Sequence, residues 1–458
     1  MPDDDFAAVV EAVRDRVVPT DEERRQLRET VAALTERAEA AVADLPVDAE
    51  VLQVGSTARD TWLAGDRDID LFVAFPPDLD RDDLEEYGLQ VGHAVLPDGH
   101  EEYAEHPYVV GTCDGYDVDL VPCFDVADAT AIQSAVDRTP FHTRYLRRRM
   151  DDDFADEARV AKQFCKGVGV YGSDLRTRGF SGFLLELLVC EYGGFRQLVE
   201  AAADWEPPVE LDPEGHAAAS FEDPLVVVDP TDPERNVAAV CSAENVARLQ
   251  HYARELLADP RVDLFEPDEP EPLDVAAVRE HVAARGTTPL AVRFEVPDLV
   301  EDQLWPQLDK SLAGLAEELD RRGFDVLRTT ALACEDAADA ALLVELAVAE
   351  LPAVERHEGP PVNVREHAGN FLAAYAEADA DTDIYGPFID GDRYVVERER
   401  DVTSAAAFCE SDRLFDVALG THIESALREG HDVLTGSAVA DLADPFGVEL
   451  ARYFAPRP

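Results

Sequence analysis

Two apolar, strand-like segments carry aspartates near their starts, and this pattern constrains the fold more than any other feature of the chain. They are DIDLFVAF at residues 68–75 and YDVDLVPCF at residues 116–124. Successive side chains of a strand point to opposite faces, so Asp68 and Asp70 share one face and their apolar neighbours share the other. Asp119 stands alone between apolar residues, on a strand that can lie beside the first. Three converging carboxylates repel one another unless a cation lies between them.

The chemistry of these aspartates predicts a magnesium site. Hard oxygen ligands without His or Cys are typical of Mg²⁺. Two such ions about 4 Å apart activate an attacking hydroxyl and neutralise a leaving pyrophosphate. We therefore expect Asp68, Asp70 and Asp119 to be both metal ligands and catalytic residues. The alternative is an acidic strand edge, since 98 of 458 residues are Asp or Glu and chance D-x-D pairs are common in such a chain.

A Gly-Ser turn before the first strand makes the pattern more specific. Gly55 allows a tight backbone turn. Ser56 offers a hydroxyl and an amide to a phosphate, and Arg59 can reach the same anion. Gly-Ser, a gap of eleven residues, a D-x-D strand and a later apolar-Asp-apolar strand are far stronger evidence together than separately.

This combination resembles the DNA-polymerase-beta-like nucleotidyltransferase superfamily. Several blocks resemble the archaeal, class I CCA-adding enzymes (tRNA nucleotidyltransferases) more closely, with an acidic composition that indicates a haloarchaeal member. The bacterial and eukaryotic class II blocks G-G-x-V-R-D and R-R-D-F-T are not found. The matching blocks are G-S-T-A-R-D-T-W-L from Gly55, A-E-H-P-Y-V at 104–109, V-D-L-V-P-C at 118–123, S-A-V-D-R-T-P-F-H at 134–142, V-Y-G at 170–172, R-G-F-S-G at 178–182 and D-P-x-x-x-x-R-N-V-A at 229–238.

The resemblance implies addition of C, C and A to the tRNA 3′ end from CTP and ATP, without a nucleic-acid template and with release of pyrophosphate. It implies Mg²⁺ as cofactor and the tRNA acceptor arm and elbow as partners, and it leaves a homodimer open. The implied fold is a multidomain α/β and α+β chain. Its expected parts are a polymerase-beta-like catalytic head at 1–139, a helical, nucleotide-binding neck at 140–207, an RNA-binding body at 208–280 and 384–458, and a tRNA-binding tail at 281–383.

The resemblance also assigns site residues. Asp68, Asp70 and Asp119 match the metal ligands, although some members have Glu at the first position and Asp68 is shorter. The nucleotide-binding positions are Ser56 and Arg59 on the turn, His142, Lys162, Tyr171 and Ser181 at the triphosphate, and Arg235, beside Asn236, at the incoming base.

The residues themselves support part of this assignment. Lys162 and Lys166 are two of only three lysines, and they lie one helical turn apart. A compact ammonium suits a phosphate; the alternative is a solvated helix face. His142 alone would be a satisfied loop histidine, Tyr171 a packing residue and Arg235 a member of a lone ion pair. Ser181 has glycines close by, which allow close backbone approach.

A local reversal of charge also stands out. The chain has 40 Lys and Arg against 98 Asp and Glu, a net charge of −58, yet residues 138–149 contain five Arg and no acid. This run is an expected RNA track; the alternative is salt bridging to the acidic DDDFADE that follows.

The charge as a whole indicates a habitat. An even acidic coat with few lysines is typical of a salt-saturated cytoplasm, where the Debye length at 1 M salt is roughly 3 Å. On charge alone we would exclude a nucleic-acid partner, but in molar salt counterion release contributes little, so shape, stacking and a few local cations must hold RNA.

Other expectations concern elements and location. Helices are expected over 1–45, with a Thr20–Glu23 capping box, over 141–200 and over 243–258, and strands are expected at 385–400 and 413–420. No apolar run reaches 18 residues and the N-terminus is acidic, so we expect a cytoplasmic protein without a membrane span. Seven Cys without a C-x-x-C pair fit a reduced compartment.

Two rival interpretations stay open. The first is another enzyme of the superfamily, such as a poly(A) polymerase or a small-molecule nucleotidyltransferase. The second is a non-catalytic RNA-binding protein with a decayed site, against which the intact carboxylates argue.

Overall fold

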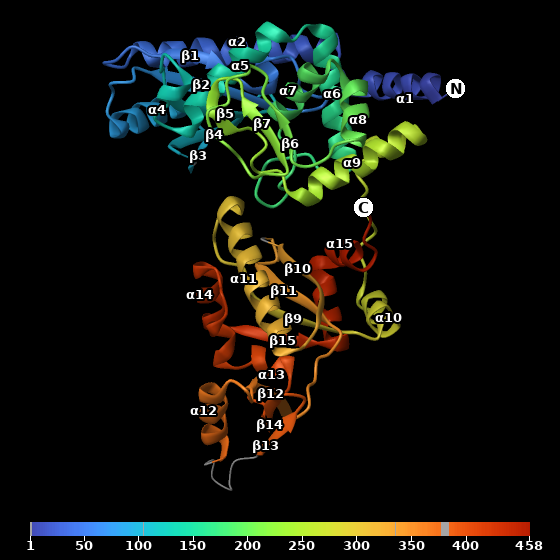
Figure 1. Ribbon diagram of the computed structural model, residues 1–458. Helices are drawn as coiled ribbons and strands as arrows, with labels where there is room; N and C mark the ends of the chain where they lie inside the picture. The colour runs from blue at the N-terminus through green and yellow to red at the C-terminus, as the bar shows by residue number, and fades with distance from the viewer. Residues whose placement is uncertain (1, 104, 335, 377–383) are drawn as a thin grey trace. The chain divides into compact units, whose positions relative to one another are not determined.

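The computed structural model describes residues 2–103, 105–334, 336–376 and 384–458. They form two compact units, residues 1–268 with 458, and residues 269–457 (Figure 1). Each unit has its own sheets and hydrophobic cores.

The first unit is built on a mixed sheet with strand order β1-β2-β5-β4-β3. β2 and β5 pair in parallel, which places Asp70 directly beside Asp119. Asp114 and Gly115, with φ angles of 51° and 80°, form the hairpin turn between β4 and β5. The strands are β1 (Glu50–Gln53), β2 (Asp68–Phe75), β3 (His100–Tyr103), β4 (Pro107–Cys113) and β5 (Tyr116–Phe124).

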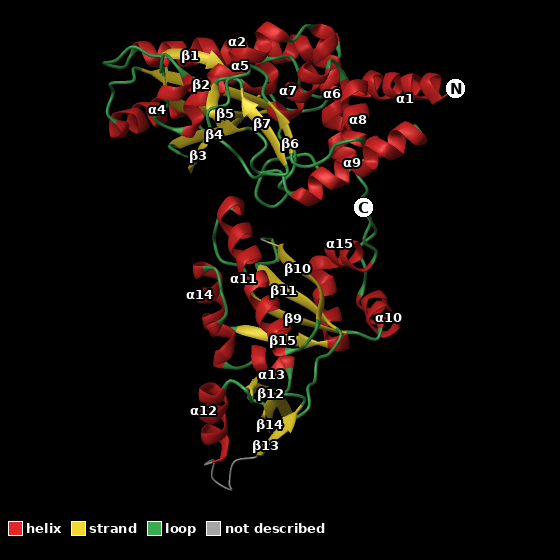
Figure 2. Ribbon diagram, viewed as in Figure 1, coloured by secondary structure: helices red, strands yellow, loops and turns green. Residues whose placement is uncertain are grey.

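Two helices cover one face of this sheet. α2 (Asp21–Ala43) and α4 (Arg81–Val95) pack on each other and on the strands (Figure 2). The alternate residues of β2 that begin with Ile69 are buried beneath them. The predicted Thr20–Glu23 capping box begins α2. The aspartates of β2 and β5 therefore lie on the opposite face, as the alternation predicts.

The rest of the first unit is mainly helical, and its core joins α1 to the helices after the sheet. The stretch 141–200, predicted to be helical, is interrupted at 168–181, where Gly169 and Gly172 have positive φ angles and Tyr171 pairs with Phe180. The remaining elements are α1 (Pro2–Val17), α3 (Gly55–Ala58), η1 (Ala129–Ala131), η2 (Ala135–Arg138), α5 (Thr139–Arg149), α6 (Asp152–Gly167), α7 (Gly182–Tyr192), α8 (Phe195–Ala203), β6 (Val209–Leu211), β7 (Leu225–Asp229), β8 (Asp232–Asn236), α9 (Ala243–Ala258) and η3 (Val262–Phe265).

The second unit contains an antiparallel sheet of order β10-β11-β9-β15 between two layers of helices. α11 and α14 pack in one core, and α10, η5 and α15 form the other. The elements are α10 (Val275–Arg285), β9 (Thr288–Glu295), α11 (Glu301–Arg322), β10 (Val326–Cys334), β11 (Asp339–Leu346), α14 (Thr421–Glu429), β15 (His431–Thr435), η5 (Gly436–Leu442) and α15 (Ala443–Phe454).

A smaller sheet of order β12-β14-β13 packs with α12. The strand predicted at 413–420 is wrong: the hydroxyl of Ser411 accepts a hydrogen bond from the Arg413 amide and begins a 3-10 turn, η4, that buries Leu414. The elements here are β12 (Val354–Pro361), α12 (Arg365–Ala376), β13 (Ile384–Asp390), β14 (Arg393–Glu399), α13 (Ala405–Cys409) and η4 (Asp412–Asp416).

The sheets group the C-terminal strands differently from the predicted body and tail. β9, within the predicted tail at 281–383, pairs with β15, within the predicted body. One sheet therefore contains strands of both the predicted tail and the predicted body, and the domain boundaries given above stay a prediction.

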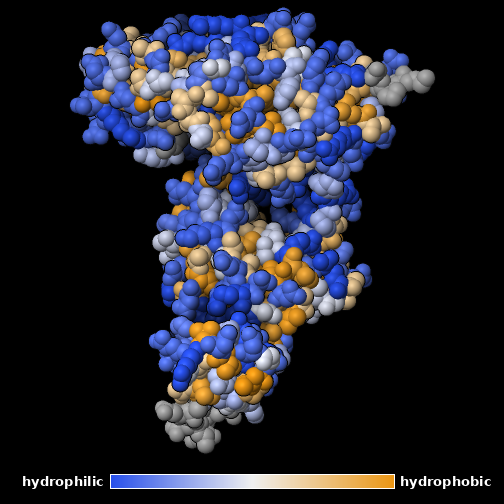
Figure 3. Space-filling model, in the orientation of Figure 1, coloured by the Kyte–Doolittle hydropathy of each residue, from blue (hydrophilic) through white to orange (hydrophobic). Residues whose placement is uncertain are grey.

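Hydrophilic residues dominate the visible surface of both units (Figure 3). Among the described residues, no helix combines the length and the apolar character needed to cross a bilayer.

The acid excess predicts that melting depends on salt. Dilution from molar KCl to about 0.1 M lengthens the Debye distance from roughly 3 Å to roughly 10 Å and strengthens repulsion among surface carboxylates. We expect the melting temperature to fall by several degrees, which calorimetry over a KCl series measures. A melting temperature that does not change with KCl would count against halophilic adaptation.

Candidate active site on the open face of the first sheet

Gly55 allows the turn before α3 to lie directly against Asp70. The residue has a φ of 72°, and a Cβ at this position would lie 1.8 Å from Asp70 Oδ2. The turn is anchored where the Val54 amide donates a hydrogen bond to the Asp70 carbonyl, at 3.1 Å. Only glycine fits this conformation and this space. The Gly-Ser turn and the D-x-D strand, separated in sequence, thus form one site.

The aspartates of this face raise one another's pKa. Burial and the neighbouring Asp119 raise the pKa of Asp70 to about 6, and the Arg59 charge offsets this only in part. Burial, Glu102 and Asp68 raise the pKa of Asp119 to about 6. Burial and neighbouring acids also raise the pKa of Asp68. A site that holds unfavourable negative charge favours a bound cation.

The donor chemistry of this face fits Mg²⁺. The carboxylates supply hard oxygen atoms whose repulsion a divalent cation would relieve. Within the ranges that the structure describes, no three His, Cys, Asp or Glu side chains stand in an arrangement that could hold a metal ion. The aspartates share one face of the two neighbouring inner strands β2 and β5, but their side chains as placed do not form a complete metal-binding site.

A buried ion cluster lies beside the turn. Arg59 donates from Nε to Glu186 Oε2 at 2.5 Å and from Nη2 to Oε1 at 3.2 Å. Lys162 Nζ donates to Glu186 Oε1 at 2.6 Å. Glu186 is completely buried and the side chain of Arg59 is 7% exposed. Burial alone would raise the pKa of Glu186, but the Arg59 and Lys162 charges lower it to about 2.

The ammonium of Lys162 is fully engaged in this cluster. Besides Glu186, it donates to the Thr61 carbonyl at 2.9 Å and to the Thr61 hydroxyl at 3.1 Å. Thr61 in turn donates its hydroxyl proton to Glu186 at 2.5 Å. Burial lowers the pKa of Lys162, and Glu186 opposes that shift. Since an ammonium has three N–H groups, these contacts use them all.

A second cluster is centred on Asp229, at the end of β7. His142 Nε2 lies 2.7 Å from Asp229 Oδ2, and Arg235 Nη1 donates to the same oxygen at 2.8 Å. Burial favours the neutral acid, but the His142 and Thr231 hydrogen bonds hold the pKa of Asp229 well below its usual range. Burial lowers the pKa of His142, whose ring stacks on Phe183 at 3.9 Å.

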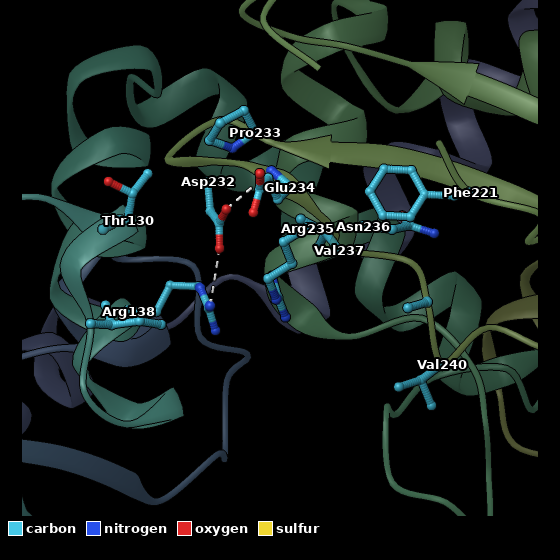
Figure 4. A pocket seen from close by; sticks show the side chains of 13 residues that line it. Thr130, Arg138, Phe221, Asp232, Pro233, Glu234, Arg235, Asn236, Val237 and Val240 are labelled. Atoms are coloured by element: carbon cyan, nitrogen blue, oxygen red, sulfur yellow. Dashed lines mark hydrogen bonds and ion pairs between the residues drawn. The ribbon is translucent and has the colours of Figure 1, made fainter. Parts of the chain in front are cut away.

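Arg235 also lines a cavity of about 710 Å³ (Figure 4). Arg138 also lines the cavity, and its Nη2 donates to Asp232 Oδ2 at 3.1 Å. Phe221 offers an aromatic ring at another part of the lining. The cavity thus combines cations, acids and a flat apolar surface.

Models of three protein families match the chain. They are a nucleotidyltransferase domain at residues 35–142, the second domain of tRNA nucleotidyltransferase at 156–266 and the C-terminal domain of the CCA-adding enzyme at 285–436. The CCA-adding enzyme of Haloarcula marismortui is 64% identical, with 99% of this chain and 100% of the relative covered. The chain belongs to the CCA-adding enzyme family.

Other CCA-adding enzymes are also similar in sequence over nearly the full length of this chain. That of Halorubrum lacusprofundi is 62% identical over 99% of this chain and 100% of its own, and that of Methanosarcina barkeri is 39% identical over 96% and 97%. The solved structure of E. coli MS115-1 CdnC with ATP is a distant likeness at 19% identity and a TM-score of 0.44, covering 57% of this chain and 94% of its own. The family and the polymerase-beta-like head predicted from the motifs, and the haloarchaeal kinship predicted from the acidic composition, are confirmed.

The structure brings four of the seven predicted nucleotide-binding residues of this CCA-adding family member into two groups. Arg59 and Lys162 meet at Glu186, and His142 and Arg235 meet at Asp229. Ser56 lies in α3, and its carbonyl accepts a hydrogen bond from the Thr61 amide at 2.9 Å.

Ser181 and Tyr171 have structural roles in this arrangement. The Ser181 hydroxyl caps α7 by accepting a hydrogen bond from the Leu184 amide at 3.1 Å. A Cβ at Gly182 would lie 3.2 Å from the Tyr171 hydroxyl and 3.4 Å from Lys162 Cε. Tyr171 also lies under Lys166, with Nζ 5.2 Å from the ring centroid. Whether these residues hold a triphosphate stays a prediction.

The two acids that organise the site were not predicted from the sequence. Glu186 is a single acid in the apolar stretch GFLLELLVC, and a lone charge in such a helix is the signal that points to it. Asp229 begins the D-P-x-x-x-x-R block, so the motif contained it without revealing its contact with His142.

Loss of the Asp229 charge is expected to weaken nucleotide binding. In Asp229→Asn, Arg235 and His142 lose a charged acceptor worth about 1.5–3 kcal/mol. We expect the KM for CTP to rise about tenfold or more, measured by labelled CTP incorporation in molar KCl. Glu234→Gln, on the same hairpin and beside the same cavity, is the matched control and should stay within about twofold of wild type. Equal KM values for the two variants would show that Asp229 does not position Arg235.

Proposed function

We propose that this chain adds C, C and A to the 3′ end of tRNA from CTP and ATP, releasing pyrophosphate. The proposed site is the face of the first sheet that carries Asp68, Asp70 and Asp119. The observation that carries the proposal is the contact of Asp70 with the Gly55 turn, beside Asp119 in register. This contact joins the expected nucleotide-binding turn to the expected metal ligands. Membership of the CCA-adding family supports the reaction itself.

The proposed reaction is in-line attack of the tRNA 3′-hydroxyl on the nucleotide α-phosphate. Asp68, Asp70 and Asp119 would hold Mg²⁺, which supplies activation of the hydroxyl and neutralisation of the pyrophosphate charge. The carboxylates lie on one face of β2 and β5, and the Gly55 turn places Ser56 beside them, where it would contact the phosphates.

The buried cluster supports a role for Arg59 at the triphosphate. Its two cations outnumber the single acid, Glu186, so the cluster keeps an excess of positive charge. Lys162 uses its N–H groups within the cluster, whereas the nearest partner of Arg59 Nη1 is the Thr143 hydroxyl at 3.4 Å. Arg59 therefore has donor capacity left for a phosphate, and Lys162 contributes charge from behind it.

Arg235 is the residue that we place at the incoming base. It lies 35% exposed on the cavity wall, and Asp229 orients its guanidinium. A planar donor fork held by a buried acid suits hydrogen bonding to the edge of a base.

Metal dependence tests the proposed chemistry. Incorporation of labelled CTP into tRNA lacking CCA, in molar KCl, should stop with EDTA and return with excess Mg²⁺. Asp119→Asn should stay inactive at every Mg²⁺ concentration. Incorporation that persists in EDTA would contradict the metal assignment, and an inactive wild type would favour the non-catalytic rival.

Two further expectations accompany the proposal. A reducing, cytoplasmic location fits the seven cysteines, none of which forms a disulfide among the described residues. Contact with the tRNA acceptor arm and elbow, and a homodimer, stay predictions.

A further inference from the structure

Helix α5 presents three arginines on one exposed face. Arg144, Arg147 and Arg148 stand at i, i+3 and i+4, which places them side by side, and each is exposed. We call these three residues the α5 basic face. In a chain with 98 acids and 40 basic residues, such a cluster is the reverse of the general pattern.

No carboxylate neutralises this face within the described part of the chain. Arg144 donates from Nε to the Pro140 carbonyl at 3.3 Å and lies over the Phe141 ring, while Arg147 and Arg148 have no ion pair. Arg149 differs, because it pairs with acids of other segments and so does not belong to the face.

Salt bridging to the acids of residues 151–157 is not observed. Asp151 accepts a hydrogen bond from the Phe154 amide at the start of α6. Asp156 pairs with Arg159 at 2.5 Å, and Glu157 pairs with Arg14 at 2.5 Å. None of the acids at 151–157 therefore forms an ion pair with Arg144, Arg147 or Arg148.

Two exposed arginines on other helices pair with an acid one turn away. Arg25 pairs with Glu22 and Glu29 on α2, and Arg428 pairs with Glu424 on α14. α5 has no acid in its sequence, TPFHTRYLRRR. The helix dipole favours cations in the last turn only, so it accounts for Arg147 and Arg148 but not for Arg144, which lies a turn earlier.

The buried side of α5 belongs to the candidate active site. His142 contacts Asp229, and Thr143 contacts Arg59. Along the helix axis, Arg144 lies about 3 Å and Arg148 about 9 Å beyond His142. The basic face therefore lies within about two helical turns of the residues that we assign to the nucleotide.

We infer that the α5 basic face binds backbone phosphates of the RNA substrate close to its 3′ end. This inference rests on the proposed function, since that function supplies the RNA. In molar salt the Debye length is roughly 3 Å, so only direct contacts contribute. Arginine suits such contacts because its guanidinium forms paired hydrogen bonds to phosphate oxygens.

The test compares two variants with the same change of charge. Arg147→Glu/Arg148→Glu alters the basic face, and Arg25→Glu/Arg28→Glu alters exposed arginines of α2. Binding of fluorescent tRNA lacking CCA is measured by anisotropy in 1–3 M KCl without nucleotide, followed by the KM for tRNA and for CTP. We expect the α5 variant to bind tRNA about tenfold more weakly. The slope of the logarithm of its binding constant against the logarithm of the KCl concentration should be smaller in magnitude by about two. The KM for CTP and the affinity of the α2 variant should stay within about twofold of wild type.

Several outcomes would overturn the inference. Unchanged tRNA affinity of the α5 variant would show that the face does not contact RNA. A rise in the KM for CTP as large as the loss of tRNA affinity would assign the face to the nucleotide. A changed mass in light scattering, with unchanged tRNA affinity, would assign it to another copy of the chain. If the Glu variant melts early, Arg147→Ala/Arg148→Ala must show the loss of affinity instead. Because tRNA binding is measured without turnover, an inactive wild type would contradict the proposed function and leave this test intact.

Discussion

Asp70→Ala and Asp119→Ala are each expected to reduce nucleotide incorporation at least about a thousandfold. Each removes an oxygen ligand from the site where charge develops during transfer, and the loss of a single preorganised group at such a site is already large. Single-turnover incorporation of labelled CTP into tRNA lacking CCA, in molar KCl with Mg²⁺, measures the loss. Asp117→Ala is the matched control because Asp117 lies two residues before Asp119 on the same strand and face, and its rate should stay within about threefold of wild type.

Loss of the Asp70 charge should not weaken the fold. The pKa of Asp70 is about 6 in the folded chain, above its usual value of 3.8. The folded state therefore binds more protons between about pH 4 and pH 6, and its stability falls as the pH rises through that window. At pH 7 without divalent ions, Asp70→Asn should melt at the wild-type temperature or above. A variant that is both inactive and markedly less stable would point to a structural role for Asp70.

Glu186→Gln is expected to lower the free energy of unfolding by about 3–5 kcal/mol. The substitution leaves the buried Arg59 and Lys162 charges without their acid, and an uncompensated buried charge is costly. Unfolding by guanidinium chloride measures the change at constant ionic strength. Glu200→Gln removes an exposed pair with Arg196 on α8 and should cost less than about 1 kcal/mol.

A double variant separates charge balance from lost packing. Glu186→Gln/Lys162→Met removes one charge of each sign, so much of the stability lost in Glu186→Gln should return. If Glu186→Gln is as stable as wild type, the cluster does not hold α6 and α7 to the turn that carries Arg59. If the double variant is less stable than either single variant, hydrogen-bond geometry matters more than charge.

The alternation of side chains in the strands predicted the carboxylate face correctly. Asp68 and Asp70 share a face because a strand has a period of two, whatever packs around it. The spacing of the Gly-Ser turn from that strand also carried information, because Gly55 must accommodate Asp70. These features are local, so a sequence can reveal them.

The organising acids depend on long-range docking, which periodicity does not encode. Glu186 lies 127 residues after Arg59, and Asp229 lies 87 residues after His142. An apolar helix with one acid shows that the acid needs a partner, but not which one. The strand expected at 413–420 failed for a related reason, because a serine cap near its start outweighed the strand-like spacing.

Product length on tRNA lacking CCA tests the central claim most directly. In molar KCl with Mg²⁺, we predict that CTP alone adds two nucleotides, that ATP alone adds none, and that both together add three and then stop. Asp119→Ala should add none under any of these conditions. Untemplated poly(A) tails with ATP alone, or wild-type products from Asp119→Ala, would contradict the assignment of CCA addition to this site.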